Sequence, residues 1–342
     1  RQMCIRDRDS IENFAKILDD TLKEVNSDYE AKRQKNIALQ PLEVIVARKD
    51  LFHDWLAQKG KLGGQHKVPR LSNTREYIEE MLELNNLHKT FNPGTVNAKT
   101  ALNDLNLTLN DGDFVTVIGG NGAGKSTMLN AVAGVWPVDC GKIVIDGVDV
   151  TRLSEHQRAA YIGRVFQDPM TGTAATMQIE ENLALAARRG KPRTLRIGIT
   201  KAEREQYREL LKTLDLGLED RLTARVGLLS GGQRQALTLL MATMNNPKLL
   251  LLDEHTAALD PKTALKVLTL SARIVEENHL TTMMITHNMK DAIKYGNRLI
   301  MMYEGHVIYD VRGEEKANLQ VSDLLPVSYT HLRAHETSQD LV

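Results

Sequence analysis

The feature that most constrains the fold is a glycine-rich run that ends in lysine and serine, Gly119-Gly-Asn-Gly-Ala-Gly-Lys-Ser126. It matches the spacing GxxxxGK[ST] in full, follows an apolar run at 114–118 and precedes a helical pattern at 125–132. Glycine lets the backbone fold around a phosphate with several N–H groups pointing inward, and the helix N-terminus adds partial positive charge. The even spacing of the glycines, followed by Lys-Ser, argues against a dinucleotide-binding GxGxxG loop. The run therefore predicts a phosphate-binding loop between a strand and a helix, with Lys125 on the β- and γ-phosphates and Ser126 on Mg²⁺.

The rest of the second part of the chain alternates apolar, β-rich runs with helical patterns. Such alternation predicts a largely parallel sheet covered on both faces. The predicted strands are 114–118, 142–146, 249–252, 282–286 and 298–303. The predicted helices are 125–132, 201–214, 231–245, 261–278 and 289–295.

Two carboxylates follow directly after the apolar run Leu249–Leu252. Apolar residues on both faces indicate a central parallel strand, and ligands bind beyond the carboxyl ends of such strands. Asp253 is then placed to hold Mg²⁺, and Glu254 to polarise a water that attacks the γ-phosphate.

A second anion site is predicted at Leu229-Ser-Gly-Gly-Gln233, which precedes a helical pattern. Ser230 is a good N-cap, and Gly231 and Gly232 expose backbone N–H groups at a helix N-terminus. Since one domain already holds the phosphates at 119–126, a second phosphate site implies a second chain or a large closure.

Together these motifs resemble the ABC-type ATPase subunits, over about residues 80–326. The resemblance assigns Walker A to Gly119–Ser126, the signature to Leu229–Gln233 and Walker B to Leu250–Asp253. Its remaining assignments are the Q-loop glutamine Gln167, the catalytic glutamate Glu254, the D-loop Ala257–Asp260, the switch histidine His287 and the adenine-stacking aromatic Phe91.

The resemblance implies an α/β P-loop NTPase of the ABC type, with a mainly parallel sheet core, an antiparallel β subdomain and a helical subdomain at about 168–228. It implies ATP and Mg²⁺ as cofactors and ATP hydrolysis coupled to transport. The catalytic residues would be Glu254, His287 and Gln167, and the metal ligands Ser126, Gln167 and Asp253. The nucleotide-binding residues would be Phe91, Gly119, Asn121, Gly122, Ala123, Gly124, Lys125, Ser126, Thr127, Ser230, Gly231, Gly232, Gln233 and Asp260.

Partner chains are implied as well. Each ATP would sit between Walker A of one subunit and the signature of a second, identical subunit, and the helical subdomain would contact an integral-membrane permease. A substrate-binding protein and a peripheral position on the cytoplasmic face of the plasma membrane follow from the same resemblance. With 44 basic and 44 acidic residues the chain has no general attraction to nucleic acid, and no such partner is expected. The pattern at 171–184 resembles importers of amino-acid type.

The two ends and the first segment differ from this core. Residues 1–8 and 327–337 resemble translated sequencing adapters, so 1–8 and 327–342 are expected to be disordered and without function. Residues 9–79 resemble the C-terminal end of the auxin-responsive acyl-acid amido synthetases, above all in the basic stretch Lys59–Asn73. We interpret them as a small α+β fragment without its adenylating domain, joined to a complete second unit that begins near Met81.

Two other functions stay open. A non-transport ABC ATPase acting on DNA or ribosomes tends to carry a coiled-coil insertion or a second cassette, whereas only 105 positions separate Lys125 from Ser230. A remnant of an acyl-adenylate-forming ligase would rest on 9–79 alone, and pyrophosphate release would identify it.

Two residues depart from the family pattern: Phe91 replaces the commoner tyrosine, and His255 replaces the commoner proline. We interpret His255 as a tolerated variant.

Overall fold

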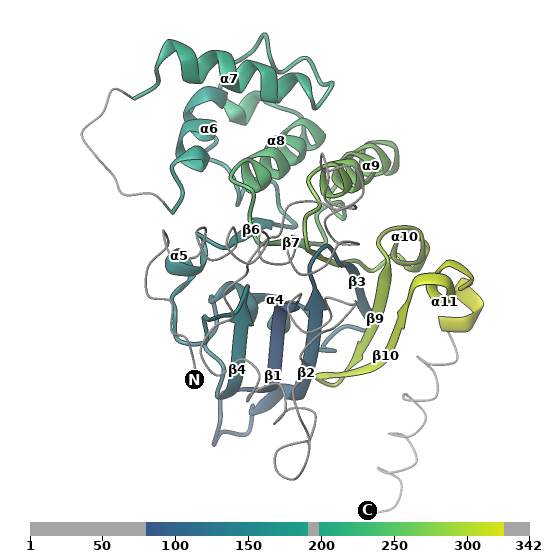
Figure 1. Ribbon diagram of the computed structural model, residues 1–342. Coiled ribbons are helices and arrows are strands. Elements are labelled where there is room, and N and C mark those ends of the chain that lie inside the picture. Colours follow the sequence, from purple (N-terminus) through teal and green to yellow (C-terminus); the bar gives the residue numbers. More distant parts are fainter. Residues whose placement is uncertain (1–79, 191–197, 325–342) are drawn as a thin grey trace, which may run out of the picture. The chain divides into compact units, whose positions relative to one another are not determined.

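The computed structural model of the chain describes residues 80–190 and 198–324 (Figure 1). The chain divides into two units, Arg1–Asn73 and Thr74–Val342, and all described residues lie in the second. The segments predicted at 1–8, 9–79 and 327–342 therefore lie outside the described residues.

Six strands form the sheet that carries the candidate site. Their order is β10 (His306–Arg312), β9 (Arg298–Tyr303), β3 (Phe114–Gly119), β8 (Thr282–Ile285), β7 (Leu249–Asp253) and β6 (Ile162–Val165). All neighbours are parallel except β10, which runs antiparallel to β9. The four leucines of β7 are fully buried, as expected for a central strand with both faces covered. Because side chains alternate along a strand, Leu249 and Leu251 enter one core, and Leu250 and Leu252 enter another.

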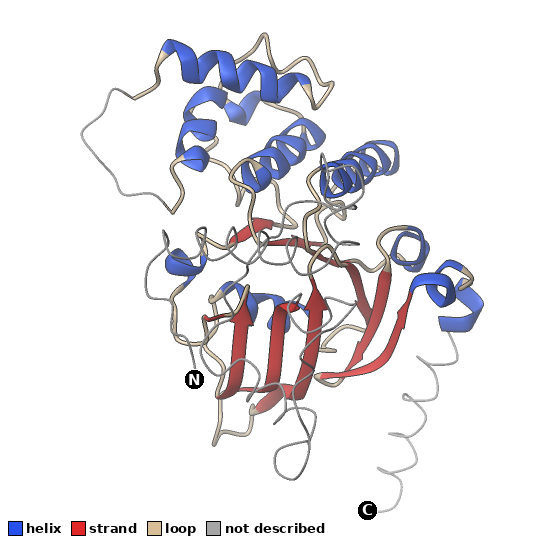
Figure 2. Cartoon of the chain, viewed as in Figure 1, coloured by secondary structure: helices blue, strands red, loops and turns tan. Residues whose placement is uncertain are grey.

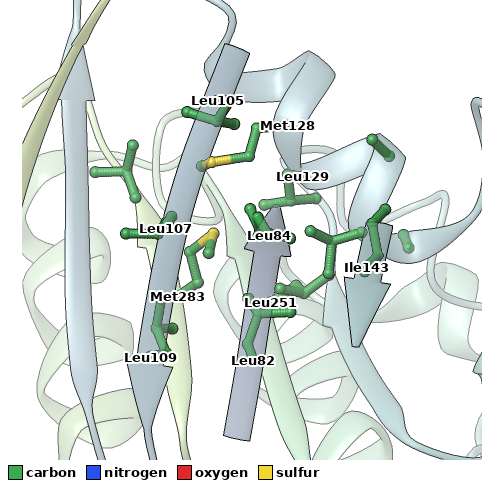
Figure 3. Close-up of a cluster of buried hydrophobic side chains, with 14 of the residues drawn as sticks. Leu82, Leu84, Leu105, Leu107, Leu109, Met128, Leu129, Ile143, Leu251 and Met283 are labelled. Atoms are coloured by element: carbon green, nitrogen blue, oxygen red, sulfur yellow. The ribbon is translucent and has the colours of Figure 1, made fainter. Parts of the chain in front are cut away.

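The first core lies between this sheet and a second, antiparallel sheet. The second sheet has the order β2 (Lys99–Asn110), β1 (Glu80–Phe91), β4 (Cys140–Ile145) and β5 (Val148–Asp149). Helix α4 (Lys125–Ala133) contributes to the same core and buries most of its residues, since it contacts strands of both sheets. Figure 3 shows Met128 and Leu129 of α4 among leucines of β1 and β2, with Leu251 and Met283 from the parallel sheet.

The second core lies under helices on the other face of the parallel sheet (Figure 2). These helices are α6 (Ile179–Ala187), α7 (Lys201–Lys212), α8 (Gly231–Thr243) and α9 (Pro261–Glu277). Figure 1 shows α6, α7 and α8 grouped at one end of the described residues. Tyr207 and Leu211 place the apolar stripe of α7 in this core, and the opposite face of α7 is charged and exposed.

A third, smaller core surrounds the edge of the parallel sheet, where α10 (Met289–Lys294) and α11 (Gly313–Ala317) join β9 and β10. Two short helical elements, α5 (Glu155–Arg158) and η2 (Val226–Leu228), complete the described elements. No helix within 80–190 or 198–324 is long and apolar enough to span a bilayer.

The predicted fold class is confirmed, with small shifts at the ends of elements. The strand predicted at 142–146 begins two residues earlier, at Cys140, and it belongs to the antiparallel sheet instead of the parallel one, because it pairs antiparallel with β1. The helix predicted at 201–214 ends at Lys212. The chain turns away there because Asp215 adopts a left-handed conformation with φ of 54°.

Candidate functional site

Four neighbouring parallel strands bring the predicted motifs to one edge of the sheet. The order β3-β8-β7-β6 places their carboxyl ends side by side. The glycine-rich loop follows β3, and His287 follows β8. Asp253 is the last residue of β7, Glu254 comes directly after it, and Gln167 follows β6. Gly119 and His287, which are 168 positions apart in the sequence, therefore lie at the same edge of the sheet. Ligands of parallel α/β sheets bind in the crevice at this edge.

The loop between β3 and α4 has a backbone that only glycine fits at two points. Gly119 has a φ of 147°, and a Cβ there would lie 2.3 Å from the carbonyl oxygen of Met302. Gly124 has a φ of 97°, and a Cβ there would lie 2.5 Å from the carbonyl oxygen of Ala101. Gly124 is also the N-cap of α4 and offers no side chain to the free N–H groups of the first turn. The loop thus presents backbone donors to an anion.

The other predicted loop residues divide by exposure. Asn121, Gly122 and Ser126 are exposed, whereas Ala123 and Thr127 are buried. The ammonium group of Lys125 folds back on the loop and donates to the carbonyl oxygens of Gly119 (2.8 Å) and Gly120 (3.0 Å). Burial lowers the pKa of Lys125, and the nearby carboxylate of Glu254 partly opposes this shift.

Glu254 and His287 form the closest side-chain pair in the crevice. His287 Nε2 lies 2.7 Å from Glu254 Oε1, with His287 half exposed and Glu254 13% exposed. Glu254 has a φ of 45°, a conformation that costs a non-glycine residue about 1–3 kcal/mol and is concentrated at functional sites. A pocket of about 500 Å³ opens beside the pair and extends to the first turns of α9.

Three side chains offer oxygen donors for a metal ion: the hydroxyl of Ser126, the amide of Gln167 and the carboxylate of Asp253. Ser126 and Gln167 are exposed, and Asp253 is 16% exposed. Within the described residues no three His, Cys, Asp or Glu side chains gather as a complete metal cage. A small set of oxygen ligands fits Mg²⁺, which keeps several waters and shares its sphere with substrate phosphates.

The signature residues are arranged as a helix N-terminus. Ser230 caps α8: its hydroxyl accepts from the N–H of Gln233 (3.3 Å), and its own N–H donates to Gln233 Oε1 (3.2 Å). Ser230 and Gly231 are exposed, and Gly232 is buried. Among the hydrogen bonds of the described residues, none joins 229–233 to the loop 119–127. Within one chain, hydrogen bonds thus do not connect the phosphate loop 119–127 to the second predicted phosphate site at 229–233.

Two further predicted residues have structural partners here. Asp260 caps α9 by accepting from the N–H of Thr263 (3.0 Å), and this bond holds the pKa of Asp260 below its usual value. The ring of Phe91 meets Trp136 edge-on, with centroids 5.1 Å apart. Its stacking on adenine stays a prediction.

His255, the residue that departs from the family pattern, is fully buried behind the site. Its Nε2 lies 2.9 Å from the hydroxyl of Ser271 in α9. Burial lowers the pKa of His255 to about 4, so the ring is neutral near pH 7. This position supports the interpretation of a structural variant.

Sequence reasoning missed Arg164 and Lys99. Arg164 lies in β6 and binds Asp253, but no strand was predicted at 162–165, so no local pattern pointed to this residue. Lys99, at the start of β2, brings its ammonium group near Gly122, where a Cβ would lie 3.3 Å from it. Only the fold places Lys99 there, since it is distant from every motif in the sequence.

Comparisons with known proteins agree with this geometry. The ABC transporter family matches residues 102–257, and the GH3 family C-terminal domain matches residues 2–76. A tyrosine transport ATP-binding protein of Clostridioides difficile is 44% identical, over 72% of this chain and 97% of the relative. A phosphonates import ATP-binding protein of Lactobacillus acidophilus is 32% identical, over 71% of this chain and 94% of the relative.

A solved structure of a dimeric ATP-binding cassette in a post-hydrolysis state, bound to ADP and Pi, is also similar. It is 32% identical, with a TM-score of 0.58 over 68% of this chain and 98% of that one. The predicted resemblances are thus confirmed for both parts of the sequence. The chain belongs to the ABC transporter family, as an ATP-hydrolysing, ATP-binding subunit preceded by a segment that matches the GH3 C-terminal domain.

Proposed function

We propose that this chain energises an ABC importer of amino-acid-like substrates by binding and hydrolysing ATP with Mg²⁺. The observation that carries the proposal is the convergence of the phosphate loop, Asp253 and the Glu254–His287 pair at one sheet edge. The transport relatives named for tyrosine and methionine support the substrate class.

The nucleotide is held mainly by the loop 119–127. Its backbone N–H groups and the N-terminus of α4 bind phosphate oxygens, and Lys125 exchanges its two loop carbonyls for the β- and γ-phosphates. Phe91 stacks on the adenine. Ser126, Gln167 and Asp253 would hold Mg²⁺, which would supply positive charge to offset the negative charge of the phosphates.

Hydrolysis is carried by Glu254. Its carboxylate accepts a proton from water, whose oxygen forms a bond to the γ-phosphorus while the bond to the β-phosphate oxygen breaks. His287 Nε2 lies 2.7 Å from Glu254 Oε1, and with ATP bound the ring N–H would donate to the γ-phosphate beside Glu254. Gln167 senses that phosphate and connects it to the helical subdomain at about 168–228.

The second phosphate site implies a homodimer. Ser230, Gly231, Gly232 and Gln233 of one copy, at a helix N-terminus, complete the nucleotide site of the other, and Asp260 lies at the same interface. The helical subdomain then transmits closure to an integral-membrane permease served by a substrate-binding protein, with the subunit on the cytoplasmic face of the plasma membrane. No nucleic acid takes part.

The test is the variant Glu254→Gln, which keeps the shape of the side chain and removes its basicity. We expect phosphate release to fall by about 10²–10⁴-fold, with ATP binding retained and a closed dimer accumulating on gel filtration. Glu277→Gln, on an exposed residue at the end of α9, is the matched control. Normal turnover in Glu254→Gln would remove Glu254 from this role.

The substrate class is tested separately, with the subunit assembled on its permease in proteoliposomes. We expect tyrosine or methionine, presented with the binding protein, to stimulate ATP hydrolysis, and spermidine to have no effect. Stimulation by spermidine alone would contradict the amino-acid assignment while leaving the ATPase assignment intact.

A further inference from the structure

Arg164 lies at the centre of the predicted motifs, although none of them contains it. It occupies the third position of β6, between Gly163 and the buried Val165, and only 12% of its side chain is exposed. Its Nη2 lies 3.2 Å from Asp253 Oδ2 and 2.8 Å from Asn130 Oδ1. One nitrogen therefore joins the carboxylate at the end of β7 to the helix that follows the phosphate loop.

The two partners of Arg164 are themselves tied to the site. Asn130 donates to the carbonyl oxygen of Ser126 (2.8 Å), one helical turn earlier in α4. On another side, the guanidinium carbon lies 4.6 Å from the ring centroid of Phe166, which directly precedes Gln167. Stacking on an aromatic face and bonding to carboxylate are what a planar guanidinium does well and an ammonium does poorly.

These contacts fix the orientation of Asp253. A carboxylate with one oxygen bound cannot rotate freely, so Oδ2 stays toward Arg164 and Oδ1 is left for another ligand. Residues that bind a metal ligand in this way raise metal affinity by orienting it, and removing such partners typically lowers affinity about 10–100-fold.

We propose that Arg164 is a positioning residue that orients Asp253 toward Mg²⁺ and couples it to the phosphate-loop helix through Asn130. The inference rests on the proposed role of Asp253 as a metal ligand. It predicts that Arg164 contributes to the part of nucleotide affinity that depends on Mg²⁺.

The experiment measures the dissociation constant of a fluorescent ATP analogue with Mg²⁺ and with EDTA, for each variant. The magnesium advantage is the ratio of the second constant to the first, and it does not depend on the folded fraction of a preparation. We expect Arg164→Met to reduce this ratio about tenfold. Arg164→Lys keeps the charge, so it should preserve binding in EDTA while losing the magnesium advantage, because an ammonium cannot stack flat on Phe166 while it bonds Asp253 and Asn130.

Two controls separate the possible causes. Arg158 is also buried and donates to the carbonyls of Ala131 and Val132 in the same helix α4, so Arg158→Met should lower stability and leave the ratio unchanged. Asp253→Asn must lower the ratio if the proposed metal site is right. An unchanged ratio in Arg164→Met beside a lowered ratio in Asp253→Asn would overturn this inference alone. An unchanged ratio in Asp253→Asn would overturn the metal site, and the inference with it.

Discussion

At the scale of single residues, His255 shows how a departure from a family pattern can be built into the core. Its Nε2 lies beside the hydroxyl of Ser271, and that hydroxyl donates its only hydrogen to the carbonyl of Val267 (2.9 Å). The ring must therefore donate to Ser271, which ties the chain after Glu254 to α9. A proline at this position could make no such bond.

This arrangement predicts a stability loss in Ser271→Ala. The substitution leaves the buried Nε2–H of His255 without its acceptor, which costs about 1–3 kcal/mol. His255→Ala should cost about 2–4 kcal/mol, because a cavity adds to the lost bond. Urea unfolding of both single variants and the double variant measures the coupling. Equal stability of Ser271→Ala and the parent chain would show that the bond contributes nothing.

Lys316 supplies a prediction about pH. It is buried, donates to the carbonyls of Tyr295 and Gly296, and burial lowers its pKa from 10.5 to about 8. Between these two values the unfolded chain binds the proton and the folded chain has released it, so folding gains stability as pH rises. Below about pH 8 both states are protonated and the burial cost is present in full.

Relative to Lys316→Met, the free energy of unfolding of the parent chain should rise by up to about 3 kcal/mol between pH 8 and pH 10.5. Denaturant unfolding at several pH values in this window checks the result. Parallel pH profiles of the two proteins would mean that Lys316 titrates as it does in water.

At the scale of elements, two helices begin with the same capping arrangement, and only one carries a predicted phosphate site. Thr200 caps α7 in the same way as Ser230 caps α8. The cap hydroxyl accepts from the backbone N–H of the third helical residue, which is Glu203 in α7 and Gln233 in α8. The side chain of that third residue accepts in return from the backbone N–H of the cap. Ser230→Ala and Thr200→Ala should each lower stability by about 1 kcal/mol.

Only Ser230→Ala should also weaken ATP-dependent dimerisation, since its hydroxyl and helix end face the nucleotide of a second copy in our proposal. Analytical ultracentrifugation in the Glu254→Gln background compares the two variants directly. Equal dimerisation of both would contradict a role for Ser230 beyond capping its helix.

The elements also show what the sequence could predict. Strands β3, β7, β8 and β9 were recognisable because apolar residues cover both faces, and the motifs after β3, β7 and β8 gave the site. Strand β6, a four-residue edge strand, was not predicted because it is too short to show a clear pattern. Strands β2 and β10 were not predicted either, and register shifts interrupt their pairing with β1 and β9. The contact of Arg164 with Asp253 depends on the pairing of β6 with β7, which no local pattern specifies.

At the scale of the whole molecule, the predicted chemistry is confined to the second unit. The three cores of the described residues run from Leu82 to Leu324, and the candidate site extends from Phe91 to His287. The GH3 C-terminal match, at 2–76, overlaps neither. Catalysis and most of the stability of the second unit should therefore not require the first.

Removing residues 1–73 leaves residues 74–342, the second unit alone, for comparison with the full chain. Both should release phosphate from ATP with the same kcat and KM, and both should show the unfolding transition of the second unit at the same urea midpoint, because the three cores of the described residues and every proposed catalytic group are retained. Adding carboxylic acids such as indole acetate to the full chain should produce no pyrophosphate. The proposed site breaks the bond between the β- and γ-phosphates, whereas acyl activation would break the bond between the α- and β-phosphates. A fall in kcat on removing residues 1–73 would show that the first unit acts on the site. Pyrophosphate formed only by the full chain would instead support an acyl-activating role for the first unit.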